Sequence, residues 1–164
     1  MAPLKARDIG ADKTGVRITS ELPVMLPQRA AQAYAQIGIE TGVAASSPHR
    51  LILMLYDGAL AAIHDAGAHL AAGRVGPKGE AVSKAISLIE TGLKGSLDVE
   101  KGGAIAAQLS DLYDYMSRRL LLASMRNDPQ GFTEVAGLLR ELRGAWSGIE
   151  GAHAGERQGA VMAA

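Results

Sequence analysis

Residues 47–60, SPHRLILMLYDGAL, constrain the fold most, because a helix start stands directly before the densest apolar run of the chain. Ser47 can accept a hydrogen bond from a first-turn N–H group, and the ring of Pro48 already sets the φ of the first helical position. Apolar residues then recur every three or four positions and predict two adjoining rows: Ile52, Leu55, Ala59, Ala62, Ala66 and Leu70 in one, and Leu53, Tyr56, Leu60 and Ile63 in the other. A helix with two apolar rows must pack against more than one neighbour.

Three later segments have the same helical period. Pro77 and Pro129 stand where two of these segments begin, a position at which a missing N–H costs nothing. The third helix ends near Asn127, and residues 96–103, SLDVEKGG, form a turn before it. The apolar rows of the second, third and fourth helices are Val82, Ile86, Ile89, Leu93 and Leu97; Ile105, Leu109, Leu112, Met116, Leu120 and Ala123; and Phe132, Val135, Leu139, Leu142, Trp146 and Ile149.

The lengths of these segments predict how they pack. Each helix has roughly 20 to 25 residues, or about 30 to 37 Å, and the links between helices have about three to seven residues. Because short links make consecutive helices antiparallel neighbours, the prediction is an all-α, up-down-up-down four-helix bundle over residues 46–150. Residues 1–45 lack a sustained period and predict a flexible N-terminal arm, in which the stretch from Tyr34 to Ile39 could dock on the domain, and residues 151–164 predict a disordered tail.

Composition and charge narrow the function. The 164 residues suffice for one domain that folds without disulfides or metal, and the absence of cysteine excludes thiol catalysis and thiolate metal sites. The 17 basic and 17 acidic residues cancel, so we expect no nucleic-acid binding. No segment approaches eighteen consecutive apolar residues, and residues 1–13 lack the apolar part of a secretory signal. We therefore expect no membrane insertion and a cytoplasmic location.

No metal site, cofactor or enzymatic activity is predicted. Glu150 and His153 form one Glu-x-x-His unit, which di-iron bundles use twice, but here it occurs once and in a Gly-rich segment. The other histidines have no second ligand at helical spacing, so we expect them to face solvent. They are His49, His64 and His69. Residues 73–80, GRVGPKGE, lack the Gly-Lys-Ser/Thr ending of a phosphate loop and are interpreted as an interhelical turn.

Three features go beyond a plain bundle. Residues 111–121, DLYDYMSRRLL, place two tyrosines close to two arginines, either as a boundary row of amphipathic side chains or as a recognition strip. Residues 56–58, YDG, interrupt the first helix with an acid and a helix-weakening glycine. Glycines inside the predicted helices either loosen the free protein or let helices approach closely: Gly58, Gly67, Gly92, Gly95, Gly137, Gly144 and Gly148.

Motifs at these places resemble those of one protein family. In chain order they are Ala33-Tyr34 ahead of the Ser-Pro helix start, LILMLYDGAL, SLDVEKGG, LSDLYDYMSRRLL and LLRELRGAW. The resemblance extends from about Ala33 to Ile149 with the motifs in order and at fitting distances, which makes it more specific than any single motif. The family is that of FliS, the flagellar secretion chaperone for flagellin.

The resemblance implies a cytoplasmic bundle that binds the disordered C-terminal segment of flagellin, prevents early polymerisation and passes flagellin to the export apparatus. It also implies a lid around Tyr34 and Ile37 that covers part of the groove until flagellin displaces it. This chain departs from the family in having roughly 30 residues before the Ala-Tyr pair and in helices rich in Gly and Ala. Residues expected to contact the client are Leu51, Met54, Leu55, Tyr56, Asp57, Leu97, Leu109, Tyr113, Tyr115, Arg118 and Arg119.

A second class of function stays open. A helical scaffold or oligomerisation module would bury its surplus apolar rows against copies of itself, whereas a chaperone would keep them for amphipathic helices and extended pieces of a client. The molecular mass in solution separates the two, since a chaperone of this kind is expected to be monomeric or weakly dimeric without its client.

Overall fold

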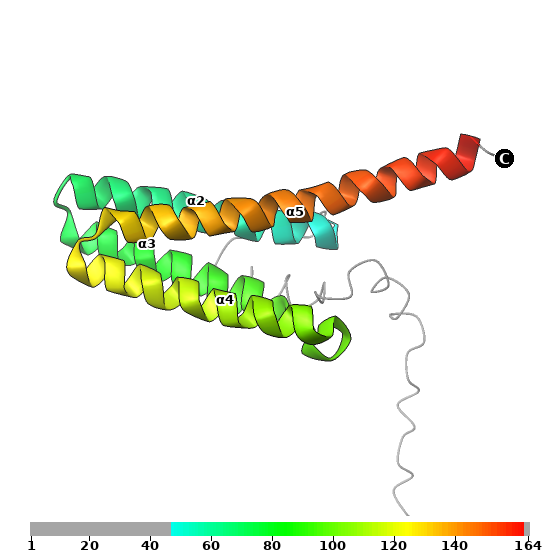
Figure 1. Ribbon diagram of the computed structural model, residues 1–164. Coiled ribbons are helices and arrows are strands. Elements are labelled where there is room, and N and C mark those ends of the chain that lie inside the picture. The colour runs from blue at the N-terminus through cyan, green and yellow to red at the C-terminus, as the bar shows by residue number, and fades with distance from the viewer. Residues whose placement is uncertain (1–46, 163–164) are drawn as a thin grey trace, which may run out of the picture.

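The computed structural model describes the backbone of residues 47–162 and the side chains of residues 47–149. The predicted arm at 1–45, with Tyr34 and Ile37, lies outside the described residues. Within them every regular element is helical, which confirms the all-α prediction (Figure 1). The elements are α2 (Pro48–Ala71), α3 (Val75–Ser87), the π-helical η3 (Leu88–Leu93), the 3₁₀-helical η4 (Lys94–Ser96), α4 (Val99–Arg126) and α5 (Pro129–Met162).

The four long helices form a ring around one core. Helix α2 packs against α3 and α5, and α4 packs against the same two helices from the opposite side. Figure 1 shows the chain reversing direction between α2 and α3 and again between α4 and α5. Both of these reversals lie at the same end of the bundle, which brings the end of α4 close to the start of α3.

Helix α2 begins where the sequence predicts and supplies the middle of the core. Ser47 Oγ accepts the backbone N–H of Arg50 (3.2 Å), which satisfies one of the unpaired donors of the first turn. Members of both predicted rows, such as Leu55 and Tyr56, are buried, because α2 contacts η3 as well as α3 and α5. Among the described helices α2 alone has the length and hydropathy of a membrane span, a property that it shares with core helices of soluble proteins.

The turn before α3 is shorter than predicted. Residues 73–80 were expected to form an interhelical turn, but α3 already begins at Val75 and Pro77 lies within its first turn. The first N–H groups of an α-helix have no partner inside the helix, so a proline is tolerated there as well as at the very first position. The sequence marked the correct region for a helix start but placed it two residues late.

The second predicted helix does not keep one period. After Ser87 it widens into η3, a π-turn that takes one more residue than an α-turn, and then tightens into η4. As a result Leu88 and Gly92 are buried in addition to Ile89 and Leu93, which belong to the predicted row. A Cβ added to Gly92 would lie 2.7 Å from Leu55 Cδ2, so this glycine lets η3 approach α2 closely.

Helix α4 starts earlier than predicted. Asp98 Oδ1 accepts the N–H of Lys101 (3.2 Å) and caps a first turn inside the segment interpreted as a turn at 96–103. Gly103, with φ 53° and ψ −132°, then interrupts the helix. The other end is as predicted, because Asn127 takes the left-handed conformation (φ 50°) that closes many helices.

Helix α5 extends past the predicted boundary. The sequence ended the last helix at Glu150 and left residues 151–164 without regular structure, but the helical backbone continues to Met162. The segment has no apolar period, yet it contains Ala, Glu, Arg and Gln and no proline. Extending an existing helix avoids the cost of nucleation, so the alanines and long polar residues suffice without an apolar face, despite Gly151, Gly155 and Gly159.

Candidate binding surface

Five of the residues predicted to contact a client lie in the core. None of them is more than 4% exposed, and their role in this conformation is packing between helices. They are Leu51, Leu55, Tyr56, Leu97 and Tyr113. Met54 and Leu109 are half-buried and pack against the same core. Helical spacing placed Leu55, Tyr56 and Leu97 in apolar rows, but it could not show that neighbouring helices cover them on both sides.

Tyr56 and Tyr113 meet inside the core. Their hydroxyl oxygens are 2.6 Å apart, which joins α2 to α4 through one hydrogen bond. Burial raises the pKa of both phenols, so both stay protonated over the physiological range. Each hydroxyl provides the hydrogen-bond partner of the other inside the core, which explains in structural terms why both residues are tyrosines.

The remaining predicted contact residues are accessible, and most of them form polar links between helices. Asp57 of α2 accepts a two-pronged ion pair from Arg143 of α5. The Asp57 carboxylate raises the pKa of that guanidinium. Arg118 is exposed on α4 and forms no ion pair with any other residue in the range 47–149. It is therefore the predicted contact whose charge is most available to a partner.

Tyr115 and Arg119 share one acceptor on α5. The Tyr115 hydroxyl donates to Glu134, and Arg119 Nε donates to the other carboxylate oxygen at 2.7 Å. Arg119 Nη1 also donates to Asp128 at 3.1 Å. The hydrogen bonds from Tyr115 and Arg119 hold the pKa of the Glu134 carboxyl below its usual value. Glu134 was not predicted, because the cluster is formed by two helices and only the α4 half carried a recognisable pattern.

Exposed apolar side chains follow the outside of α4. Tyr115, Leu122 and Met125 are 41%, 41% and 71% exposed, and together with Arg118 they recur at intervals of three and four. Such spacing places them on one face of the helix. Leu121, 51% exposed, lies beside this row. We call these five residues the outer stripe of α4. The run Leu120-Leu121-Leu122 signalled it in the sequence, because three consecutive helical residues cannot all face the core.

The first part of α4 leaves a second apolar area open. Ile105 was predicted to be a core residue but is 62% exposed, and Val99 is 57% exposed. Leu109 and Leu112, which continue the row from Ile105, are only half-buried. Figure 1 shows α5 diverging from α4 toward this end of the bundle, so the row loses its cover here. A regular apolar period predicts which face is apolar but not how far along the helix a neighbour extends.

The histidines do not all face solvent as expected. His49 is buried: its ring stacks on Trp146 with centroids 5.4 Å apart, and its Nε2 donates to the Trp146 carbonyl at 2.6 Å. His69 is half-buried and accepts a hydrogen bond from Arg74 Nε (2.9 Å), whereas His64 is exposed. Among the described side chains no group of three His, Asp or Glu residues is placed to hold a metal ion.

Comparisons with known proteins agree with the motifs. The family model "Flagellar protein FliS" matches residues 30–153, a range that includes α2, α3 and α4 and most of α5. The flagellar secretion chaperone FliS of Salmonella typhimurium (strain LT2) is 55% identical over 118 residues, which cover 72% of this chain and 87% of that protein. The chaperone FliS of Escherichia coli (strain K12) is 43% identical over 122 residues, or 74% and 90% of the two chains. The chaperone FliSB of Pseudomonas aeruginosa is 38% identical over 125 residues, or 76% and 98%. The chain therefore belongs to the FliS family of flagellar proteins.

Proposed function

We propose that this protein is a cytoplasmic export chaperone that binds the C-terminal segment of flagellin. Binding would prevent premature polymerisation, and the complex would deliver flagellin to the flagellar export gate. The relatives named above are flagellar secretion chaperones, which supports a secretion client. Binding, rather than catalysis, is the activity that this proposal requires.

The outer stripe of α4 is the observation that carries the proposal. Its apolar side chains are exposed in a row about three turns long, and Arg118 and the hydroxyl of Tyr115 lie among them. An amphipathic helix binds to such a surface through apolar residues at intervals of three and four. Exposed apolar area of this kind commonly marks a protein interface.

The open area at the start of α4 would extend the contact. A client that is disordered when free must be ordered on binding, at a cost of about 2 to 5 kcal/mol, so a long interface is needed to offset that cost. Ile105 and the half-buried Leu109 lie on the same helix as the outer stripe, toward its other end. A flagellin segment that follows α4 would contact both areas. The buried members of the predicted set would then support the surface instead of touching the client.

Calorimetry with this protein and flagellin tests the proposal. We expect full-length flagellin to bind one to one. A flagellin that lacks its last ~50 residues should not bind, because roughly that length of chain is needed to follow helices of about 30 Å. Equal binding of the two forms would refute a site for the C-terminal segment.

Substitutions on α4 locate the contact. Replacing Leu122 and Met125 together by Ser is expected to weaken flagellin binding about tenfold or more, which corresponds to about 1.4 kcal/mol. Ile149→Ser is the matched control, because Ile149 is also an exposed apolar residue (38%) but lies on α5. If the control weakens binding as much as the α4 variant does, the client does not use the outer stripe.

The segment around Tyr34 and Ile37 is proposed to act as a removable lid. Both residues precede α2 closely enough in the chain to reach the bundle. Deleting residues 1–44 is expected to strengthen flagellin binding, by about 0.5 to 1.5 kcal/mol for each ordered side chain that the client no longer has to displace. Weaker binding after the deletion would instead make the segment part of the client site.

Oligomerisation through the outer stripe is the alternative. An exposed apolar row can pair with a second copy as well as with a client, so the same observation supports it. Sedimentation of the free protein distinguishes the two proposals. A chaperone should be a monomer or a weak dimer, whereas a stable oligomer that Leu122→Ser/Met125→Ser dissociates would favour a scaffold.

A further inference from the structure

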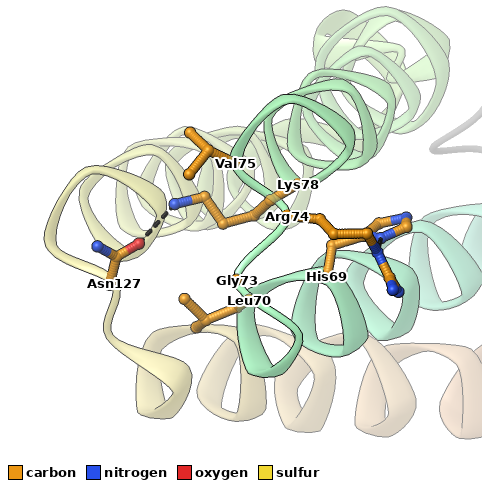
Figure 2. Close-up of a pocket in the computed structure, with 7 residues that line it drawn as sticks. All are labelled: His69, Leu70, Gly73, Arg74, Val75, Lys78 and Asn127. Carbon is orange, nitrogen blue, oxygen red and sulfur yellow. Dashed lines mark hydrogen bonds between the residues drawn. The ribbon is translucent and has the colours of Figure 1, made fainter.

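A pocket of about 300 Å³ opens where the α2–α3 turn meets the end of α4 (Figure 2). This volume is at the lower end of the range for sites that bind small molecules or single side chains of a partner. Its lining includes His69, Leu70, Arg74, Val75, Lys78 and Asn127. None of them belongs to the outer stripe or to the residues predicted to contact flagellin.

Lys78 contributes a buried positive charge to this pocket. The side chain is 6% exposed, and its Nζ donates to the carbonyl oxygen of Ser124 (2.9 Å) and to Asn127 Oδ1 (2.6 Å). Both acceptors are neutral, and no carboxylate among the described residues forms an ion pair with this lysine. Buried charges in proteins are ordinarily paired, because removing an unpaired charge from water is costly. An anionic group in the pocket would supply the missing charge.

The other polar groups of the pocket are also donors. Arg74 Nε donates to His69 Nδ1, which leaves the terminal N–H groups of its guanidinium available. Helix α3 begins at Val75 without a side-chain cap and without an acidic residue in its first turn, so its first backbone N–H groups add to the positive potential. Asn127 uses its oxygen toward Lys78, so its amide group can only donate to a ligand. No lining residue is acidic.

Apolar surface accompanies these donors. Figure 2 shows Lys78 extending toward Asn127 on the same side of α3 as Val75, while Arg74 extends to the opposite side, toward His69. Val75 is 73% exposed. A free inorganic anion would leave the Val75 side chain in water, whereas an acidic peptide would bring an anion and an apolar side chain together.

We propose that this pocket binds the carboxylate of an acidic side chain in a protein segment, with an apolar neighbour of that side chain packed beside Val75. The site is separate from the proposed flagellin contact, and the proposal does not depend on that contact. It gives the unpaired ammonium of Lys78 a partner that arrives only in a complex.

Nuclear magnetic resonance of the ¹⁵N-labelled full chain tests this site with three probes. They are the peptide acetyl-Leu-Glu-Leu-amide, its neutral counterpart acetyl-Leu-Gln-Leu-amide, and inorganic phosphate, at matched ionic strength. We expect the Glu peptide to cause saturable shifts of the Val75 and Gly76 amide signals and of Arg74 Nε. The Gln peptide should bind about tenfold or more weakly, because hydrogen bonds to a charged group are stronger than neutral ones.

Two variants and two controls assign the effect to the pocket. Lys78→Met and Arg74→Gln should each weaken binding of the Glu peptide severalfold, and Arg74→Gln serves if the buried lysine proves necessary for folding. Lys84→Met, on the exposed side of α3, and Arg140→Gln, on α5, remove the same charge elsewhere and should leave binding unchanged. Equal shifts with the Glu and Gln peptides, saturable binding of phosphate without binding of the Glu peptide, or equal losses in variants and controls would each overturn the proposal.

Discussion

The hydroxyl oxygens of Tyr56 and Tyr113 lie 2.6 Å apart in the core and form a hydrogen bond between α2 and α4. We predict that Tyr56→Phe lowers the free energy of unfolding by about 1 to 3 kcal/mol, because it removes this bond and leaves the buried hydroxyl of Tyr113 without its partner. Urea unfolding of Tyr56→Phe, of Tyr113→Phe and of the double variant measures the effect. The double variant should cost less than the sum of the single ones, and simple additivity would contradict an interaction between the hydroxyls.

Two glycines of α5 should respond to alanine with opposite signs. A Cβ on Gly131 would lie 2.5 Å from the Cβ of Ala123 and 2.7 Å from Arg119 Nη1, whereas a Cβ on Gly137 would meet no atom beyond its own stretch of helix within 4 Å. Gly131→Ala is expected to destabilise the protein by about 1 to 3 kcal/mol through overpacking. Gly137→Ala should stabilise it by about 0.5 to 1 kcal/mol through helix propensity. Unfolding midpoints that shift in the same direction would contradict this distinction.

Gly103 should tolerate no side chain without strain. Its φ of 53° with ψ of −132° is a conformation that residues with a Cβ avoid, so Gly103→Ala is expected to cost about 1 to 3 kcal/mol although the surrounding space is open. Gly67→Ala is the matched control, because that position is also open and lies inside α2. Thermal melts should show a lower midpoint for the first variant and an equal or higher midpoint for the second.

Acidic pH should abolish the contribution of the Glu134 carboxylate to the free energy of unfolding. Because hydrogen bonds from Tyr115 and Arg119 lower its pKa in the folded state, its contribution to stability is fully present above the ordinary value of 4.5 and is lost as the pH falls through the lower, folded value. The free energy of unfolding should therefore fall less steeply below pH 4.5 in Glu134→Gln than in the unsubstituted protein. Glu141→Gln, also exposed on α5, should keep the steeper slope.

Flagellin should stabilise the folded protein. A client that binds only the folded form, at about 100 times its dissociation constant, adds about 2.7 kcal/mol to the free energy of unfolding. The melting midpoint should then rise by several degrees, and the rise should be smaller for Leu122→Ser/Met125→Ser at the same flagellin concentration. An unchanged midpoint with the unsubstituted protein would contradict binding to the folded bundle.

Local signals in the sequence predicted the ends of several helices. Ser47 with Pro48 marks the start of α2, and Asn127 marks the end of α4, because capping depends on one side chain and its own turn. The early start of α4 at Val99 and the continuation of α5 to Met162 were missed, since neither shows an apolar period. Periodicity detects the faces that pack, and both of these stretches are helical without such a face.

The candidate site was less predictable than the fold. Spacing correctly placed Tyr56 on an apolar face, whereas Tyr113 was assigned to a boundary row or a recognition strip and is buried, because burial depends on a second helix that the period does not specify. For the same reason Ile105 was assigned to the core, while Leu122 and Met125 were overlooked. His49 was expected in solvent because it has no second metal ligand at helical spacing, and its stacking partner, Trp146, is far away in the chain. Contacts between residues of different helices depend on where each helix ends and where two helices diverge.

The π-turn at Leu88–Leu93 uncouples the length of the chain from the rotation of the helix. Deleting one residue from an ordinary α-helix turns everything beyond it by about 100°, so an apolar row leaves the core. Inside η3 the deletion of Thr91, which is exposed, could instead be absorbed by tightening the π-turn to an α-turn, with the flanking segments left in phase. The bundle thus contains one position along its second helix at which the number of residues can change without reassigning which side chains face inward.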